Sequence, residues 1–107
     1  MIKAIFSQNA TGVIDGFSVT GHADSGPYGQ DIVCAAVSGL SITIINGLQQ
    51  VVGENPKVTL DEENGGLMMV SQLSDKHDTQ ILLKTFYNGI LDMAESYSDF
   101  LTVKLDN

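Results

Sequence analysis

The chain contains a single cysteine, Cys34, which excludes an internal disulfide and the paired thiols of a thioredoxin-like site. It has no tryptophan, and it has five basic residues against thirteen acidic ones, so its formal net charge is -8 and its isoelectric point is about 4.3. This imbalance disfavours direct binding to nucleic acid, because phosphate contacts need lysine and arginine. It favours an encounter with a basic protein, although acidity of this kind commonly serves only solubility.

Long uninterrupted apolar runs and secretory features are also missing. Ser, Thr, Asn and Gly interrupt the apolar stretches before they reach the roughly 20 residues of a membrane span. Met1–Phe6 carries one lysine but lacks the apolar region and the small-residue cleavage site of a signal peptide. We therefore expect no membrane helix and a cytoplasmic location. The length of 107 residues predicts one domain, residues 1–107.

Metal, phosphatase and nucleotide sites lack the residues that they require. One cysteine and two distant histidines, His22 and His77, fall short of the ligand set of a zinc site. The charged segment Ser74–Asp78 around His77 predicts an exposed helix start. No cation follows Cys34 as in a cysteine phosphatase, and no Lys-Ser/Thr pair follows the glycines as in a nucleotide loop. We expect neither a metal nor a cofactor.

Alternating apolar residues predict a hairpin at the start of the chain. Ile2–Phe6 and Val13–Thr20 alternate and are joined around Asn9–Gly12, which carries turn-forming residues. Asp15 and Gly16 indicate an irregularity in the second strand. The predicted buried residues are Ile2, Ala4 and Phe6 in the first strand and Val13, Phe17 and Val19 in the second.

A long helix is predicted from Asp31 to about Gly53. Asp31 suits the N-cap because its carboxylate can accept a first-turn N–H, and apolar residues then recur every three or four positions. The β-branched run Ile42–Ile45 would also suit a strand, but a periodic pattern of about twenty residues favours a helix. The predicted buried stripe is Val33, Val37, Leu40, Ile44, Leu48 and Val51, and a neighbouring, more polar face carries Cys34, Ser38 and Ser41.

The remainder predicts a second hairpin, a second helix and a last strand. Strands Val58–Glu62 and Leu67–Leu73 flank Asn64–Gly65, a step suited to a tight turn. A helix from about Asp75 and an alternating segment, Phe100–Leu105, follow. The order ββαββαβ predicts an α+β fold, in which an antiparallel or mixed sheet packs against two helices. The predicted buried face of the second helix is Leu82, Phe86, Ile90, Met93 and Tyr97.

Cys34 is the candidate nucleophile. The thiolate is the reactive form of cysteine, and either a helix N-terminus or a nearby imidazolium stabilises it. His22 lies twelve residues earlier, at the entrance of the Gly-rich segment Gly21–Gln30, so the two side chains can converge. Asp31 either orients His22 or caps the helix, with capping favoured, and Ser38 packs or bonds locally. The alternative is that Cys34 is an inert core residue, because free cysteine is commonly buried.

The signature Gly21-His22-Ala23, a Gly-rich loop, and then Asp31-Ile32-Val33-Cys34-Ala35-Ala36-Val37-Ser38 resembles the ribosomal-processing cysteine protease family, Prp. The signature covers about 18 residues, and the element order and length extend the resemblance across the chain. The resemblance implies a homodimeric bacterial endopeptidase. Its implied substrate is a large-subunit ribosomal protein, the one numbered twenty-seven, from which it removes a short N-terminal extension.

The resemblance also implies roles for the residues of the signature. His22 and Cys34 match the catalytic pair of the family, with Asp31 and Ser38 as supporting positions. The Gly-rich substrate loop would order over the substrate, and its positions are Gly21, Ala23, Gly26, Pro27, Tyr28 and Gly29.

The expected reaction is attack of the Cys34 thiolate on the scissile carbonyl, with His22 as the base and then the acid. Backbone N–H groups at the helix start, including that of Cys34, would stabilise the oxyanion. A competing hypothesis is a non-catalytic module that binds a basic ribosomal segment through its acidic surface. A third is a redox sensor, which would show reversible sulfenylation without peptide cleavage.

Overall fold

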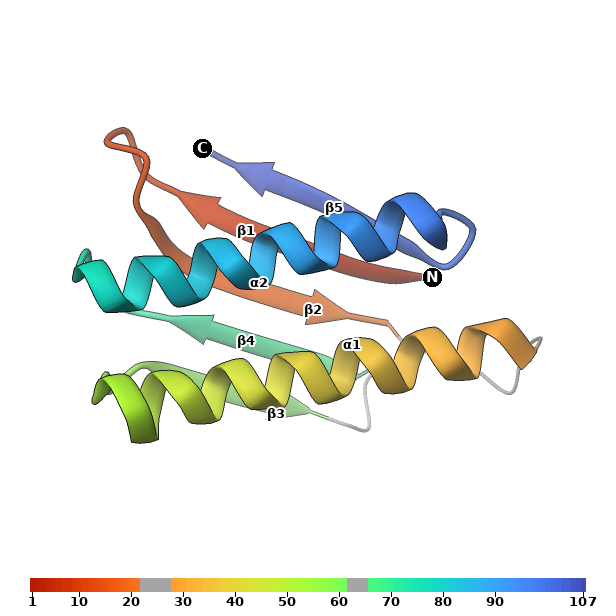
Figure 1. The fold of residues 1–107 in the computed structure, drawn as a ribbon, viewed down its shortest axis with the longest axis horizontal. Helices are drawn as coiled ribbons and strands as arrows, with labels where there is room; N and C mark the ends of the chain where they lie inside the picture. The colour runs from red at the N-terminus through yellow and green to blue at the C-terminus, as the bar shows by residue number, and fades with distance from the viewer. Residues whose placement is uncertain (22–27, 62–65) are drawn as a thin grey trace.

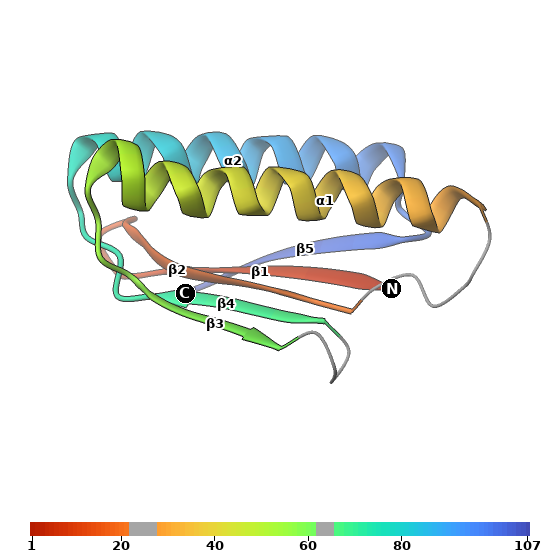
Figure 2. The same cartoon turned by 90° about the horizontal axis from the view of Figure 1, so that it is seen from below.

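The described residues fold into two layers, a five-stranded sheet and two helices that lie side by side on one face of it (Figure 1, Figure 2). The computed structural model describes residues 1–21, 28–61 and 66–107, with side chains of the first helix described from residue 32 onward. The predicted α+β fold and its ββαββαβ order are confirmed. The elements are β1 (Ile2–Gln8), β2 (Ile14–Thr20), α1 (Tyr28–Asn46), η1 (Gly47–Val52), β3 (Lys57–Asp61), β4 (Leu67–Ser71), α2 (His77–Ser96) and β5 (Leu101–Asp106).

The sheet is mixed, with the strand order β3-β4-β2-β1-β5. β5 runs parallel to β1, with Leu101 opposite Ile2, whereas the other neighbouring strands are antiparallel. The first and last strands of the described chain are therefore neighbours, and both predicted hairpins, β1 with β2 and β3 with β4, are confirmed. The predicted Asn64–Gly65 turn lies outside the described residues.

A β-bulge in β2 confirms the predicted irregularity. The register with β1 skips Asp15, because the partners of β1 pass from Gly16 directly to Ile14. The extra residue shifts the alternation by one position, so Ile14 is buried and Val13 is only half-buried. The prediction that Val13 belongs to the buried face was therefore wrong.

The centre of the core is a cluster of aromatic rings between α2 and the sheet. The ring centroid of Phe6 lies 5.8 Å from that of Phe17, 5.3 Å from that of Phe86 and 5.1 Å from that of Tyr87. Phe17 and Phe86 also meet edge to face, with centroids 5.0 Å apart. These contacts attach α2 to β1 and β2.

The first helix begins earlier than predicted. It starts at Tyr28, so Asp31 lies within its first turn and is not the N-cap, and Gly29 is helical as well. Glycine disfavours a helix by only about 1 kcal/mol per residue, so Tyr28 and Gly29 are helical although the glycines of this segment had indicated a loop. Cys34 is consequently the seventh helical residue, whereas a helix with Asp31 as its N-cap would make Cys34 the third.

The helix continues into the π-helix η1 and ends at Gly53, as predicted. Gly53 is left-handed, with φ 84°, and its N–H donates to the Leu48 carbonyl. Val51 is 83% exposed, so its place in the buried stripe was wrong. The i→i+5 bonding of a π-helix rotates the residues after Asn46 relative to an α-helical pattern. The rest of the stripe is confirmed, with Val33, Val37, Ile44 and Leu48 buried and Leu40 partly buried.

The second helix confirms an exposed start at His77. Its buried face differs in part from the prediction, because Leu83 is fully buried. The prediction that Tyr97 belongs to this buried face was wrong, since the helix ends at Ser96 and Tyr97 is exposed. The remaining predicted positions face inward, with Phe86 and Ile90 buried and Leu82 and Met93 partly buried.

One stretch among the described residues, Ile32–Val52, is long and apolar enough to span a bilayer, with a hydropathy of 1.7. Ser, Thr, Asn and Gly interrupt this stretch, as expected, but its mean hydropathy still meets the criterion. In this fold the stretch packs on the sheet through Val33, Val37 and Leu48. Core helices can meet the same criteria of length and composition, so the stretch does not assign a membrane location.

Candidate active site

Cys34 lies between α1 and the sheet, where its half-buried side chain lines a cavity of about 90 Å³. A half-buried thiol that borders a cavity is not enclosed by core packing on every side. This placement argues against the interpretation of Cys34 as an inert core residue. The cavity is lined by Ile2, Val19, Gly21, Cys34, Val37, Ser38, Ser41, Gly66 and Met68.

Two serines of α1 share this cavity with Cys34. Ser41 is fully buried, and its Oγ donates to the Val37 carbonyl at 2.7 Å, so its hydroxyl proton is used within the helix. Ser38 lies one turn after Cys34 and is exposed, although it lines the same cavity. Ser38, a predicted supporting residue, is therefore the serine that can contact a bound group.

Gly21 borders the cavity at the end of β2, in a conformation that favours glycine. Its φ is +83°, and a Cβ built on it would overlap the carbonyl oxygen of Met1. The absent side chain lets the end of β2 pass against residue 1.

The structure brings three of the predicted site residues, Gly21, Cys34 and Ser38, to one cavity. The other predicted site residues fall outside the described side chains. Tyr28, Gly29 and Asp31 are placed in the first turn of α1 by their backbone, which removes Tyr28 and Gly29 from the predicted loop, and His22, Ala23, Gly26 and Pro27 lie outside the described residues. The pairing of His22 with Cys34 thus stays a prediction.

The position of Cys34 in α1 changes the chemistry expected of it. Only the first four N–H groups of a helix lack intrahelical partners, and the seventh residue is not among them. The helix dipole also acts mainly within the first turn. The expectation that the Cys34 amide holds an oxyanion was therefore wrong. The helix start therefore contributes little to the stabilisation of a Cys34 thiolate.

A larger cavity, of about 510 Å³, lies over the opposite face of the sheet. Its lining includes Ile5, Ser18 and Met69, which sit at alternate positions to the buried residues of their strands. It contains neither Cys34 nor any other residue of the signature, so volume alone does not identify the reactive site. Among the residues that the structure describes, no group of His, Cys, Asp and Glu could hold a metal ion.

Sequence reasoning missed the contribution of the sheet to this cavity. Met68 of β4 and the preceding Gly66 both line it. Alternation in β4 indicates that Met68 and Val70 share a face, but it does not indicate which strand lies next to β4. Met68 reaches the cavity because β4 pairs with β2, where it lies opposite Val19.

Comparison with known proteins is consistent with this geometry. The family model described as cysteine protease Prp matches residues 1–102. The ribosomal processing cysteine protease Prp of Bacillus subtilis is 32% identical over 107 residues, with 96% of each chain covered. The protein of the same name from Staphylococcus aureus is 28% identical over 99 residues, which cover 92% of this chain and 93% of that protein.

Solved structures share the whole fold. A crystal structure from Streptococcus mutans has a TM-score of 0.91 and 36% identity, and the match covers 99% of this chain and 97% of that one. Prp from S. aureus in complex with a substrate peptide has a TM-score of 0.90 and 26% identity, with 99% and 100% covered. The same S. aureus protein, with a covalently linked product peptide, has a TM-score of 0.86 and 28% identity, with the same coverage.

Proposed function

The chain belongs to the ribosomal-processing cysteine protease family Prp and is a cysteine protease of that family, and we propose that it removes the N-terminal extension of the large-subunit ribosomal protein numbered twenty-seven. The observation that carries this proposal is the side chain of Cys34, which lines a cavity between α1 and the sheet. The S. aureus relative binds a substrate peptide and, in another structure, carries a covalently linked product peptide.

The proposed mechanism uses Cys34 and His22. His22 accepts the proton of the Cys34 thiol, and Sγ bonds to the scissile carbonyl carbon to form a tetrahedral intermediate. The C–N bond then breaks, His22 gives its proton to the leaving amine, and a thioester remains. A water molecule, deprotonated by His22, hydrolyses the thioester and returns the free thiol. Ser38, in the same cavity, and Asp31 are supporting residues in this scheme.

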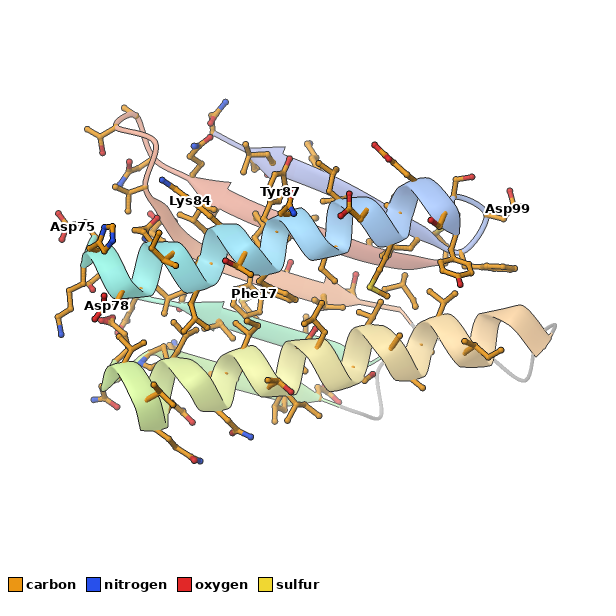
Figure 3. The ribbon with its side chains drawn as sticks, viewed as in Figure 1. Phe17, Asp75, Asp78, Lys84, Tyr87 and Asp99 are labelled. Carbon is orange, nitrogen blue, oxygen red and sulfur yellow. The ribbon has the colours of Figure 1, made fainter. Side chains whose placement is uncertain are left out.

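The charge of the surface supports a basic substrate. Asp92 and Glu95 are exposed near the end of α2, whose last turn carries no basic residue, and Asp99 follows. Figure 3 shows Asp99 at the end of the molecule where α1 begins, and Asp75 and Asp78 at the other end. Acidic residues at a helix C-terminus oppose the helix dipole, so helix stability gives no reason for them. A basic ribosomal segment would be attracted to the end of the molecule that carries Asp92, Glu95 and Asp99.

The test is cleavage of a synthetic peptide that spans the extension and the first residues of the mature ribosomal protein, followed by mass spectrometry. Cys34→Ala and His22→Ala should each lower kcat/KM by at least about 100-fold, because each removes a group that takes part in proton transfer or bond formation. His77→Ala is the matched control, since His77 is exposed at the start of α2. Cleavage by His22→Ala at the native rate would refute the dyad. Peptide binding without cleavage by the unaltered protein would support the non-catalytic module.

We also propose that the protein acts as a homodimer, as the family resemblance implies, and that it is located in the cytoplasm. Light scattering coupled to size-exclusion chromatography measures the mass in solution, which should be twice the 11.4 kDa of one chain. A mass of one chain at micromolar concentration would contradict the homodimer.

A further inference from the structure

Leu60 is an exposed leucine close to the cavity that contains Cys34. It lies opposite Met68 in the β3–β4 pair, and Met68 in turn lies opposite Val19 in β2. Directly opposed residues of neighbouring strands point to the same face of a sheet. Leu60 therefore points to the helix side of the sheet, as Val19 and Met68 do, and those two residues line the cavity with Cys34.

Burial decreases along this row of residues. Val19 is buried, Met68 is half-buried, and Leu60 is 63% exposed. Val58, two residues earlier on the same face of β3, packs against the core, so the helix layer covers β3 at Val58 and leaves it open at Leu60. An exposed leucine on an edge strand is an aggregation hazard, so the packing of this chain gives no reason for it.

We propose that Leu60 and Met68 form an apolar subsite, the Leu60–Met68 shelf, that holds an apolar side chain of the peptide substrate next to the bond that is cleaved. This inference rests on the proposed removal of the ribosomal-protein extension and adds a determinant of the specificity of that reaction. The shelf is continuous with the cavity of Cys34, because Met68 belongs to both. It selects for an aliphatic or aromatic side chain, since Leu60 and Met68 offer no hydrogen-bond donor to a polar one.

The geometry limits which substrate residue the shelf contacts. Neighbouring strands lie about 4.8 Å apart, so Leu60 is one strand spacing beyond Met68, at the outer side of the cavity. An extended peptide advances about 3.3 Å per residue. The side chain on the shelf therefore belongs to a residue within about two positions of the scissile bond.

A first test uses thiol alkylation and does not require proteolysis. Iodoacetamide and N-benzyliodoacetamide both react by displacement of iodide by the Cys34 thiolate, but only the second carries an apolar arm. The rate with N-benzyliodoacetamide divided by the rate with iodoacetamide should fall about 3- to 10-fold in Leu60→Ser, because only the N-benzyliodoacetamide rate falls. Leu91→Ser, an exposed leucine of α2, is the matched control and should keep the native ratio. An equal ratio in the unaltered protein and Leu60→Ser overturns the shelf.

A second test uses peptides in which each residue within two positions of the scissile bond is changed in turn to serine. For one of these positions, Leu60→Ser should lower kcat/KM about 10-fold for the peptide with the apolar residue. For the peptide with serine at that position, Leu60→Ser should change kcat/KM little. Cleavage by the unaltered protein with no dependence on Leu60 at any position overturns the shelf alone. Absence of cleavage of every peptide by the unaltered protein overturns the proposed removal of the ribosomal-protein extension instead.

Discussion

The side chain of Gln80 in α2 hydrogen-bonds both backbone groups of Ile14 in β2. Nε2 of Gln80 donates to the Ile14 carbonyl at 2.8 Å, and Oε1 accepts the Ile14 N–H at 2.9 Å. Nε2 also donates to the Ser74 carbonyl at 3.0 Å. Gln80 is buried, and Ile14 adjoins the bulge at Asp15. The amide therefore serves as a substitute strand partner where the bulge interrupts the sheet.

Replacement of Gln80 by leucine should destabilise the protein. Gln80→Leu leaves the buried N–H and C=O of Ile14 without these partners, and we expect the free energy of unfolding to fall by roughly 2–3 kcal/mol. Urea unfolding monitored by circular dichroism measures this loss. Gln50→Leu changes an exposed glutamine in the same way and should shift stability by less than about 0.5 kcal/mol. Equal stabilities for the two variants would contradict the assigned role.

Glu54 should make stability depend on pH. Its carboxylate accepts hydrogen bonds from Ser74 Oγ at 2.7 Å and Ser74 N at 3.1 Å, and Lys76 Nζ lies 3.8 Å away. The Ser74 hydroxyl is the main cause of a pKa for Glu54 that is lowered from 4.5 in the folded state. The unfolded chain therefore takes up the proton first as the pH falls. The stabilisation is complete above a pH of about 4.5 and is lost as the pH falls toward the folded pKa.

The corresponding experiment compares stability curves of the native protein and Glu54→Gln from about pH 6 to about pH 3. The difference in the free energy of unfolding between the two proteins should shrink as the pH falls, because the glutamine does not titrate. Glu95→Gln, at an exposed position in α2, provides the control. A constant difference between the native and Glu54→Gln curves would show that Glu54 contributes no pH dependence.

Gly21 should not tolerate a side chain. Gly21→Ala places a Cβ against the Met1 carbonyl at a positive φ, so residue 21 or residue 1 must move, and Gly21 borders the Cys34 cavity. We expect peptide cleavage to fall by about 10-fold or more, because small displacements of reacting groups are costly. At Gly39 a Cβ meets nothing within 4 Å, so Gly39→Ala is the matched control and should keep its activity. Full activity of Gly21→Ala would exclude a positioning role.

Ionic strength should slow the cleavage of a basic peptide. The formal net charge of -8 attracts a basic substrate over a range set by the Debye length, which shrinks with added salt. We expect kcat/KM to fall several-fold from about 50 mM to about 500 mM salt, mainly through association. A peptide with its lysines and arginines replaced by glutamine should show little salt dependence. If kcat/KM for the basic peptide does not change with salt, charge attraction does not contribute to substrate association.

Local patterns predicted the elements of this fold well, and they failed where long-range pairing or backbone bonding decides the result. Asp15 and Gly16 correctly indicated an irregular strand, because turn-forming residues weaken alternation locally. Val51 fitted an α-helical stripe, but π-helical bonding turned it outward. The role of Gln80 depends on a strand more than sixty residues away, which no local pattern reveals.

Some residues of the candidate site could likewise be predicted from local sequence, whereas others depend on long-range pairing. Cys34 and Ser38 could be identified from the signature because they are one turn apart on a single helix. Met68 could not, because only the pairing of β4 with β2 brings it to the cavity.

The parallel pairing of β5 with β1 has a consequence for the synthesis of this protein. β1 is made before β5, so the edge of β1 that pairs with β5 stays open until residues 101–106 have left the ribosome. Contacts between segments so far apart in the chain form slowly, and an open strand edge can pair with other chains. We therefore expect native structure to form only after synthesis of residue 106, with nascent chains that lack β5 prone to aggregate.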